Sequence, residues 1–192
     1  MDSSLLASKS KEGEYEQGIA DVTLRPIEIS DIDDFMVWAS DEKTAEFCIW
    51  EPYTSREDSM NFINNMVTSH PWYKAICLNG RPIGSISVRK EYDLLTPTFR
   101  GIIGYAISSK YWGQGITTKA VRLVLKTIFN EWPEMERLQA LVDVDNGASQ
   151  KVLEKCGFKK EGILRKYLVL KGRRRDMAIY SFLSTDPLVS GL

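Results

Sequence analysis

The sequence predicts a single α/β domain in which helices cover both faces of one mixed sheet. The hydrophobic period is that of strands between Trp72 and Ile107, becomes helical from Ile116 to Phe129, and returns to strands after residue 137. A chain of 192 residues with 43% hydrophobic and 27% charged residues fits one folded domain, which we expect over residues 21–192. Residues 1–20 are polar and lack an apolar period, which predicts a flexible tail.

The first third of the domain is expected to hold one strand and two helices. Val22, Leu24 and Ile27 predict a short strand that stops near Pro26. The pattern Ser30-x-x-Asp33 offers a capping box for a helix through about Ala39, and Ser55-x-x-Asp58 offers a second one. Residues 47–53 form an apolar and aromatic loop between these helices, which either packs on the edge of a core or lines a pocket.

The middle of the chain alternates from strands to a helix. Strands are predicted over Trp72 to Leu78, Ile83 to Arg89 and Phe99 to Ile107, and Asn79-Gly80 predicts a tight hairpin between the first two. Apolar residues then repeat every four positions from Ile116 to Ile128, which predicts an amphipathic helix that ends near Trp132-Pro133.

The last third predicts a buried strand, a short helix and a hairpin. The strand covers Leu138 to Val144, and the helix covers Asn146 to Cys156 with Ala148, Val152 and Cys156 facing inward and Gly157 at its C-terminal cap. Two final strands, Phe158 to Leu170 and Arg173 to Leu183, are joined by Lys171-Gly172.

Charge is divided unevenly along the chain although the net charge is only −1. Residues 1–60 hold 15 acidic and 5 basic side chains, and the remaining residues hold 11 acidic and 20 basic ones. This division is either a chance segregation of solvated faces or a pairing of the basic part with an anionic ligand and of the acidic part with a cationic one. A pI near 6.0 argues against direct binding of nucleic acid.

Hydropathy and cysteine usage exclude further classes of protein. No apolar run approaches the roughly 20 residues that span a bilayer, so we expect no membrane association and a cytoplasmic location. Cys48, Cys77 and Cys156 are far apart and lack metal-ligand spacing, which predicts buried free thiols and no metal site.

The segment from Gly104 to Ala120 carries the most chemical information. A strand enters a loop with Gly113 and Gly115, and the loop runs directly into a helix whose N-terminal amides and dipole suit a phosphate. A Walker loop is excluded because neither glycine precedes a lysine. A dinucleotide fingerprint fits poorly because its third glycine position is Thr118, although Asp143 stands where a ribose-binding acid sits. A dinucleotide-dependent oxidoreductase is therefore the weakest alternative.

Tyr111-Trp112-Gly113-Gln114-Gly115-Ile116-Thr117-Thr118-Lys119-Ala120 resembles the acetyl-CoA loop of the GNAT superfamily of N-acetyltransferases, and it is closest to the branch of the ribosomal-protein N-terminal acetyltransferases. Two further blocks agree with that family in order, residues 146–158 and residues 172–176 with Tyr180. The resemblance implies a mixed, splayed sheet of six or seven strands that holds acetyl-CoA where the strands ending at Ile107 and near Val144 diverge. It also implies direct acetyl transfer to a primary amine, either a protein N-terminal α-amine or a small molecule, by a monomer or homodimer without a metal.

The same resemblance assigns cofactor contacts along the chain. It implies that the backbone of Tyr105, Ala106 and Ile107 pairs with pantetheine, and that Asn146 holds pantetheine or substrate through its amide. The pyrophosphate would sit on the backbone of Gly113, Gln114, Gly115, Ile116, Thr117 and Thr118.

For the chemistry, family analogy points to Ser149 as the proton donor to the departing thiolate, with Tyr167 as the alternative donor. Relatives often carry a glutamate where this chain has Ile102, so the general base is open. Either another acid or an ordered water chain removes the proton, or the amine binds already neutral. We prefer Glu51 as the substitute, and Glu91, Asp93 and His70 are further candidates. The missing acid also leaves open a catalytically weak module that binds acyl-CoA or a partner.

Overall fold

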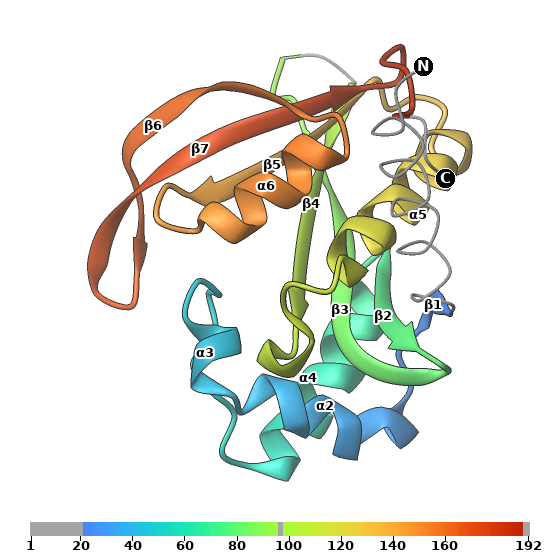
Figure 1. Cartoon of the computed structure of the whole chain (residues 1–192), viewed down its shortest axis with the longest axis vertical. Helices are drawn as coiled ribbons and strands as arrows, with labels where there is room; N and C mark the ends of the chain where they lie inside the picture. Colours follow the sequence, from blue (N-terminus) through green and yellow to red (C-terminus); the bar gives the residue numbers. More distant parts are fainter. Residues whose placement is uncertain (1–20, 96–97, 190–192) are drawn as a thin grey trace, which may run out of the picture.

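The computed structural model describes residues 21–95 and 98–189, so the predicted tail of residues 1–20 lies outside the described part. Its seven strands form one mixed sheet in the order β1-β2-β3-β4-β5-β7-β6, which confirms the predicted architecture (Figure 1). The strands are β1 (Val22–Pro26), β2 (Tyr73–Leu78), β3 (Arg81–Tyr92), β4 (Phe99–Ile107), β5 (Arg137–Asp143), β6 (Lys159–Leu170) and β7 (Arg173–Leu183).

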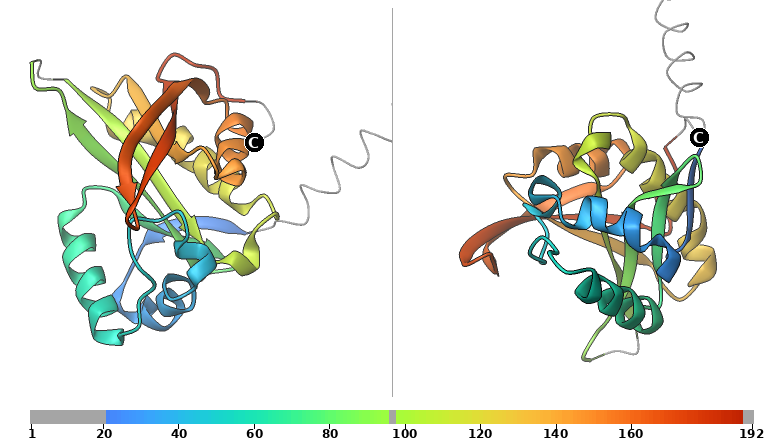
Figure 2. Two further views of the ribbon diagram at one scale, coloured as in Figure 1. Left: turned by 90° about the vertical axis from the view of Figure 1, so that its left-hand side faces the viewer. Right: turned by 90° about the horizontal axis from the view of Figure 1, so that it is seen from below.

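Helices cover both faces of the sheet, as predicted (Figures 1 and 2). On one face, α5 and α6 pack over Ile76, Ile86 and Ile103, and on the other, α2 and α4 pack over Ala75 and Cys77. The alternation of these strand residues between two cores follows from the two-residue period of a strand. The helices are α2 (Ile32–Ala39), α3 (Glu42–Ala45), α4 (Arg56–Ser69), α5 (Ile116–Glu131) and α6 (Gly147–Lys155), with short 3-10 turns η1 (Ile29–Asp31) and η2 (Ser109–Tyr111). No helix in the described ranges is long and apolar enough to cross a membrane.

Both predicted hairpin turns are confirmed, and their backbone explains their sequences. Asn79 and Gly80 have φ values of 50° and 79°, and Lys171 and Gly172 have values of 47° and 75°. Positive φ at both central residues is the requirement of the turn that matches the twist of a hairpin. The turns fix the registers Leu78↔Arg81 and Leu170↔Arg173.

Two local predictions were wrong. The capping box before α2 joins Glu28 and Asp31 rather than Ser30 and Asp33, because Arg25 holds the Asp31 carboxylate with two hydrogen bonds of 2.7 Å. In α6, Val152 and Cys156 face the core as predicted, but Ala148 is exposed, and Leu153, which was not predicted to face inward, is fully buried. The second capping pattern holds in part, since the Ser55 hydroxyl accepts the backbone N–H of Asp58 at 3.2 Å.

The sheet opens between β4 and β5, and this opening positions the site. These parallel strands pair only at Gly101↔Leu138 and Ile102↔Gln139, and the remaining residues of each strand diverge. Close packing brings the strands together at this point, because a Cβ on Gly101 would lie 2.5 Å from the Met135 sulfur and 2.8 Å from Leu138 Cδ1. The last part of β4 therefore keeps a free edge toward β5.

Candidate active site

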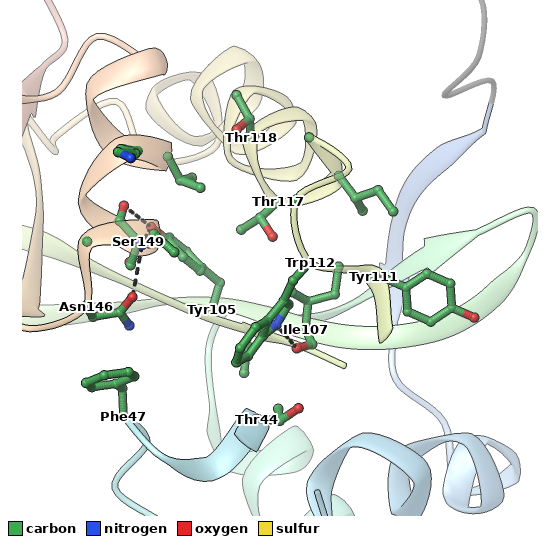
Figure 3. A pocket seen from close by; sticks show the side chains of 18 of the residues that line it. Thr44, Phe47, Tyr105, Ile107, Tyr111, Trp112, Thr117, Thr118, Asn146 and Ser149 are labelled. Atoms are coloured by element: carbon green, nitrogen blue, oxygen red, sulfur yellow. Dashed lines mark hydrogen bonds between the residues drawn. The ribbon is translucent and has the colours of Figure 1, made fainter. Parts of the chain in front are cut away.

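A cavity of about 440 Å³ lies at the end of β4, between the loop that precedes α5 and the residues that follow β5 (Figure 3). Its walls come from the end of β4, the loop before α5, the start of α6 and the segment around α3. The cavity brings together nine of the ten predicted cofactor residues and one predicted catalytic residue: Tyr105, Ala106, Ile107, Gly113, Gly115, Ile116, Thr117, Thr118, Asn146 and Ser149. Gln114 does not line it, and its side-chain amide donates to the Lys110 carbonyl at 3.2 Å.

One end of the cavity is built for an anion. Gly115 is the N-cap of α5 in the left-handed conformation, with φ of 77°, and it supplies no side-chain cap. The first turn of α5 also contains no acidic side chain that would repel an anion. The free backbone N–H groups of this turn and the positive end of the helix dipole therefore favour an anionic ligand in the cavity. The cations Lys43, Lys151 and Lys155 also line this cavity. The arrangement fits a phosphate group held by backbone amides, in a cavity whose lining also contains three lysines.

The loop that carries these amides is tied to the rest of the site at both ends of η2. The Trp112 indole N–H donates to the Ile107 carbonyl at 2.9 Å, which fixes the end of β4 (Figure 3). The Ser109 backbone N–H donates to the Thr44 hydroxyl at 3.1 Å, and that hydroxyl bonds Asp41 at 2.7 Å. Thr44 is buried, so α3 anchors the loop from the opposite side.

Three polar side chains meet in the middle of the cavity. The hydroxyls of Tyr105 and Ser149 lie 2.9 Å apart, although the residues are 44 positions apart in the sequence (Figure 3). The Asn146 side-chain oxygen accepts the Ser149 backbone N–H at 3.0 Å, which caps α6 and leaves the Asn146 NH2 group for a ligand. Burial raises the pKa of Tyr105, so its hydroxyl stays protonated.

The aromatic loop of residues 47–53 both lines the cavity and packs on a core, which are the two roles that the sequence left open. Phe47 and Cys48 line the cavity, whereas Trp50 and Tyr53 pack against the core beneath α2 and α4. Burial raises the pKa of the Cys48 thiol to about 12, against a smaller opposing effect of the Lys171 charge. A thiol with that pKa is not a nucleophilic thiolate at neutral pH.

Two predicted catalytic side chains lie outside the cavity. The Glu51 carboxylate is 74% exposed and pairs with the Lys171 ammonium at 3.4 Å. Tyr167 lies on β6, is 54% exposed and borders a separate hollow with Asp176. The structure therefore brings Ser149 to the cavity lining but not Glu51 or Tyr167.

The other acidic residues considered from the sequence do not line the cavity, and each is held by an ion pair or by hydrogen bonds elsewhere in the fold. Glu91 pairs across the hairpin with Arg100, whose Nε lies 2.6 Å from it. Asp93 accepts the Leu95 backbone N–H at 2.8 Å in the turn. Asp143 is buried and accepts hydrogen bonds from Arg175 Nε and from the Asp145 backbone N–H. Burial alone would raise the pKa of Asp143, but these hydrogen bonds lower it below its usual value. Asp143 is thus not free to bind a ribose, which removes the dinucleotide interpretation.

His70 has a structural role. Its Nδ1 accepts the Trp72 backbone N–H at 3.3 Å, and its ring packs edge-on against Tyr73 with centroids 5.7 Å apart. Burial and then the charge of Arg89 lower its pKa, so the imidazole is neutral at pH 7. At the missing acid, Ile102 is half-buried in the sheet and pairs with Arg89 and Gln139.

Several cavity residues were not predicted from the sequence. Lys151 and Lys155 stand one helical turn apart on α6, and that spacing was a readable signal of a shared face. Lys43 and Thr44 come from the acidic third of the chain, where nothing in the local sequence marks them.

Among the residues that the structure describes, no group of three or more His, Cys, Asp or Glu side chains could hold a metal ion. The cavity is instead suited to an extended organic anion, with amides at one end and hydroxyls in the middle.

Comparison with known proteins decides the family. Residues 21–159 match the acetyltransferase (GNAT) domain family. The chain belongs to this family. The uncharacterized N-acetyltransferase p20 of Bacillus licheniformis is 28% identical to this GNAT protein over 178 residues, which cover 86% of this chain and 94% of the relative.

Solved structures carry the same GNAT fold. The ribosomal-protein-S5-alanine acetyltransferase from Vibrio fischeri superposes with a TM-score of 0.68 and 26% identity, covering 86% of this chain and 94% of that one. The microcin C7 self-immunity acetyltransferase MccE, in complex with acetyl-CoA and AMP, superposes with a TM-score of 0.74 and 22% identity, covering 85% and 93%. This GNAT protein is an acyltransferase of the N-acetyltransferase class.

Proposed function

We propose that this protein transfers an acetyl group directly from acetyl-CoA to a primary amine, with a protein N-terminal α-amine as the preferred acceptor and a small-molecule amine as the other candidate. The observation that carries this proposal is the open N-terminus of α5. Its uncapped amides and the left-handed Gly115 border a cavity that lies along the free edge of β4. Acetyl-CoA supplies the activated thioester, and the residues of the chain bind and orient it.

The binding residues divide by the chemistry they offer. The amides that follow Gly115 suit the pyrophosphate, and Lys43, Lys151 and Lys155 suit the negative charge around it. The free edge of β4 offers backbone groups to the two amides of pantetheine, in the manner of an added strand. The Asn146 NH2 group is available as one further donor.

Acetyl transfer needs an oxyanion donor and a proton for the thiolate. A backbone N–H near Ile107 is the proposed oxyanion donor, because the indole of Trp112 holds this strand end in place. The amine nitrogen attacks the carbonyl carbon, the carbon–sulfur bond breaks, and the Ser149 hydroxyl gives its proton to the departing sulfur. Ser149 regains a proton from the water that takes the proton of the amine. The Tyr105 hydroxyl orients Ser149 for this step at 2.9 Å.

The amine loses its proton without help from a carboxylate on β4. Ile102 is apolar, Glu51 is exposed in an ion pair, and Asp145, which lines the cavity, is paired with Arg175 at 2.9 Å. We therefore propose that the acceptor binds as the neutral amine and that water takes the proton. This favours α-amines, with a pKa near 8, over lysine-type amines, with a pKa near 10.

Support for a protein acceptor comes from the relative named for acetylating an alanine of ribosomal protein S5, at 26% identity over most of both chains. The test is the rate of thiol release from acetyl-CoA with Ala-, Ser- and Met-initiated peptides, set beside spermidine and free amino acids. We expect the apparent pKa of the rate to follow the pKa of each acceptor amine. A rate with one fixed pKa below 7 for every acceptor would instead show a general base on the protein.

Cofactor binding is tested by calorimetry with acetyl-CoA on the wild type and on Gly115→Asp. The substitution puts a side chain at a positive φ and a carboxylate against the proposed phosphate site, so we expect binding to be lost. Gly80→Asp is the matched control, because Gly80 has φ of 79° in an open turn with nothing within 4 Å of an added Cβ. Equal affinity of the two variants would overturn the assignment of the phosphate site.

A further inference from the structure

The outer half of the β6–β7 hairpin is a strongly basic surface. We define the basic arm as residues 163–175, which contain six cationic side chains and no carboxylate. Figure 1 shows this hairpin curving away from the rest of the sheet. All of its cations except Arg175 are exposed, so their charges act on the surroundings of the protein.

Most of these charges have no acidic partner among the described residues. Lys171 pairs with Glu51, and Arg175 pairs with Asp143 and Asp145. Within residues 21–95 and 98–189 no carboxylate forms an ion pair with the other four, which are Arg165, Lys166, Arg173 and Arg174. Like charges on one hairpin repel one another, and an anionic partner would relieve this repulsion.

The basic arm also has an open strand edge with apolar side chains on it. β6 is the last strand of the sheet, so the edge that faces away from β7 has no neighbour among the described strands. Ile163, Tyr167 and Val169 are 53%, 54% and 59% exposed along this strand. Charges on an edge strand commonly guard it against aggregation, but exposed apolar side chains on the same edge work against such protection.

A large bulge shapes the arm. Between the pairs Leu164↔Met177 and Leu168↔Arg175, three residues of β6 stand opposite the single residue Asp176. Lys166 has φ of 50° there, and its backbone N–H donates to the Asp176 carboxylate at 2.7 Å. Such bulges bend a strand and often lie beside active sites.

The arm reaches the rim of the cavity. The Lys171 ammonium acts electrostatically on Cys48, and Arg175 holds Asp145 at 2.9 Å. Both Cys48 and Asp145 line the cavity. The turn of the arm and its β7 side therefore lie next to the cavity.

We infer that the basic arm binds an acidic, extended segment of a protein acceptor, which adds as a strand to the open edge of β6 while its N-terminus enters the cavity. This inference rests on the proposed function and specifies its acceptor class. Backbone groups of β6 supply sequence-independent hydrogen bonds, and the four exposed cations of the arm select carboxylates. Ile163 and Val169 contact the apolar side chains that lie between those carboxylates. RNA fits this surface less well, because a phosphate backbone uses the charges but neither the strand edge nor the aliphatic side chains.

The experiment measures fluorescence anisotropy with two labelled decapeptides on the CoA-bound protein. The first peptide is Ala-Val-Glu-Val-Glu-Val-Glu-Val-Glu-Ser, and the second has glutamine at every glutamate position. We expect the acidic peptide to bind at least about tenfold tighter at low salt, and this ratio to shrink as added salt screens the exposed charges. If the wild-type protein binds the two peptides with equal affinity, or if added salt does not change the ratio of the two affinities, the inference is overturned.

Variants then locate the site. Arg173→Gln with Arg174→Gln is expected to remove most of the preference for the acidic peptide, and Val169→Thr to weaken both peptides equally. Lys126→Gln is the control, because Lys126 is an exposed cation on α5 outside the arm. Unchanged CoA affinity and thermal unfolding confirm that each variant is folded. A preference that survives the double variant, or a labelled ten-nucleotide oligouridine that binds tighter than the acidic peptide, would refute the assignment.

Binding and turnover separate this inference from the proposed function. A protein that binds the acidic peptide selectively and transfers no acetyl group refutes the proposed function and leaves the assignment of the arm. A protein that acetylates both peptides at equal rates with equal affinities keeps the proposed function and refutes the arm.

Discussion

The pair of hydroxyls on Tyr105 and Ser149 allows a direct test of the proposed proton transfer. Tyr105→Phe keeps the buried ring and removes only the hydroxyl that lies 2.9 Å from Ser149 Oγ. A hydrogen bond of this kind contributes about 1 kcal/mol net. If the whole of that contribution serves to orient Ser149 in the transition state, kcat falls about fivefold, since about 1.4 kcal/mol corresponds to a factor of ten.

Ser149→Ala removes the proposed acid itself and is expected to lower kcat about 100-fold, as loss of a general acid does. Its effect on folding is small, because the Tyr105 hydroxyl keeps the Ser149 carbonyl as a partner at 3.3 Å. The assay is steady-state thiol release from saturating acetyl-CoA and an Ala-initiated peptide, with calorimetry as the check on cofactor binding. KM for acetyl-CoA should change little in either variant, because neither hydroxyl is assigned to cofactor binding.

The double variant decides whether Tyr105 acts through Ser149. If it does, Tyr105→Phe with Ser149→Ala is no slower than Ser149→Ala alone, because the second loss has nothing left to orient. Multiplication of the two effects would mean that the hydroxyls act independently. A kcat for Ser149→Ala within twofold of the wild type would refute Ser149 as the proton donor.

Three further outcomes follow from the structure. Gly101→Ala should lower the free energy of unfolding in urea by about 1–3 kcal/mol, because the added Cβ overpacks against Met135. Gly104→Ala is the control, because its added Cβ has its nearest contact 3.8 Å away and should lower the free energy of unfolding far less. Equal losses of stability in the two variants would contradict this packing. Hydrogen bonds from Arg137 and Ser181 lower the pKa of Glu161 to about 2, below the unfolded value near 4.5, so this contribution to stability is present above about pH 4.5 and is lost as the pH falls toward 2. Acid unfolding of Glu161→Gln should lack that component, and a curve parallel to the wild type would argue against it. Cys48→Ala should keep kcat, and mass spectrometry should find no acetylated enzyme, because the Cys48 thiol with its pKa of about 12 is protonated at neutral pH.

The sequence predicted the parts of the fold that depend on local patterns. Asn79-Gly80 and Lys171-Gly172 predict their turns because positive φ is a property of the residues themselves. The same holds for Gly115, whose left-handed backbone opens α5 toward the cavity. These features need no knowledge of distant neighbours.

Predictions that depend on distant contacts were less successful. The capping residue before α2 was wrong because Arg25, six residues before Asp31, recruits that carboxylate. The hydroxyl of Tyr105 was not identified because its partner Ser149 lies 44 residues away. Glu51 was preferred as a base from its place in the aromatic loop, but its pairing with Lys171 depends on where the β6–β7 turn lies in space.

β4 and β5 are joined by only two residue pairs, and this affects how the two parts of the sheet are held together. β1 to β4 form one half-sheet, β5 to β7 form the other, and across the β4–β5 seam only two residue pairs join their backbones. Beyond those pairs the free edge of β4 carries peptide groups that water must satisfy in the ligand-free protein. A pantetheine chain bound along that edge would form hydrogen bonds with these peptide groups, as a neighbouring strand does. The bound substrate would then contribute to the hydrogen bonding of the sheet. In each catalytic cycle, release of CoA would break these hydrogen bonds with β4, and binding of the next acetyl-CoA would form them again.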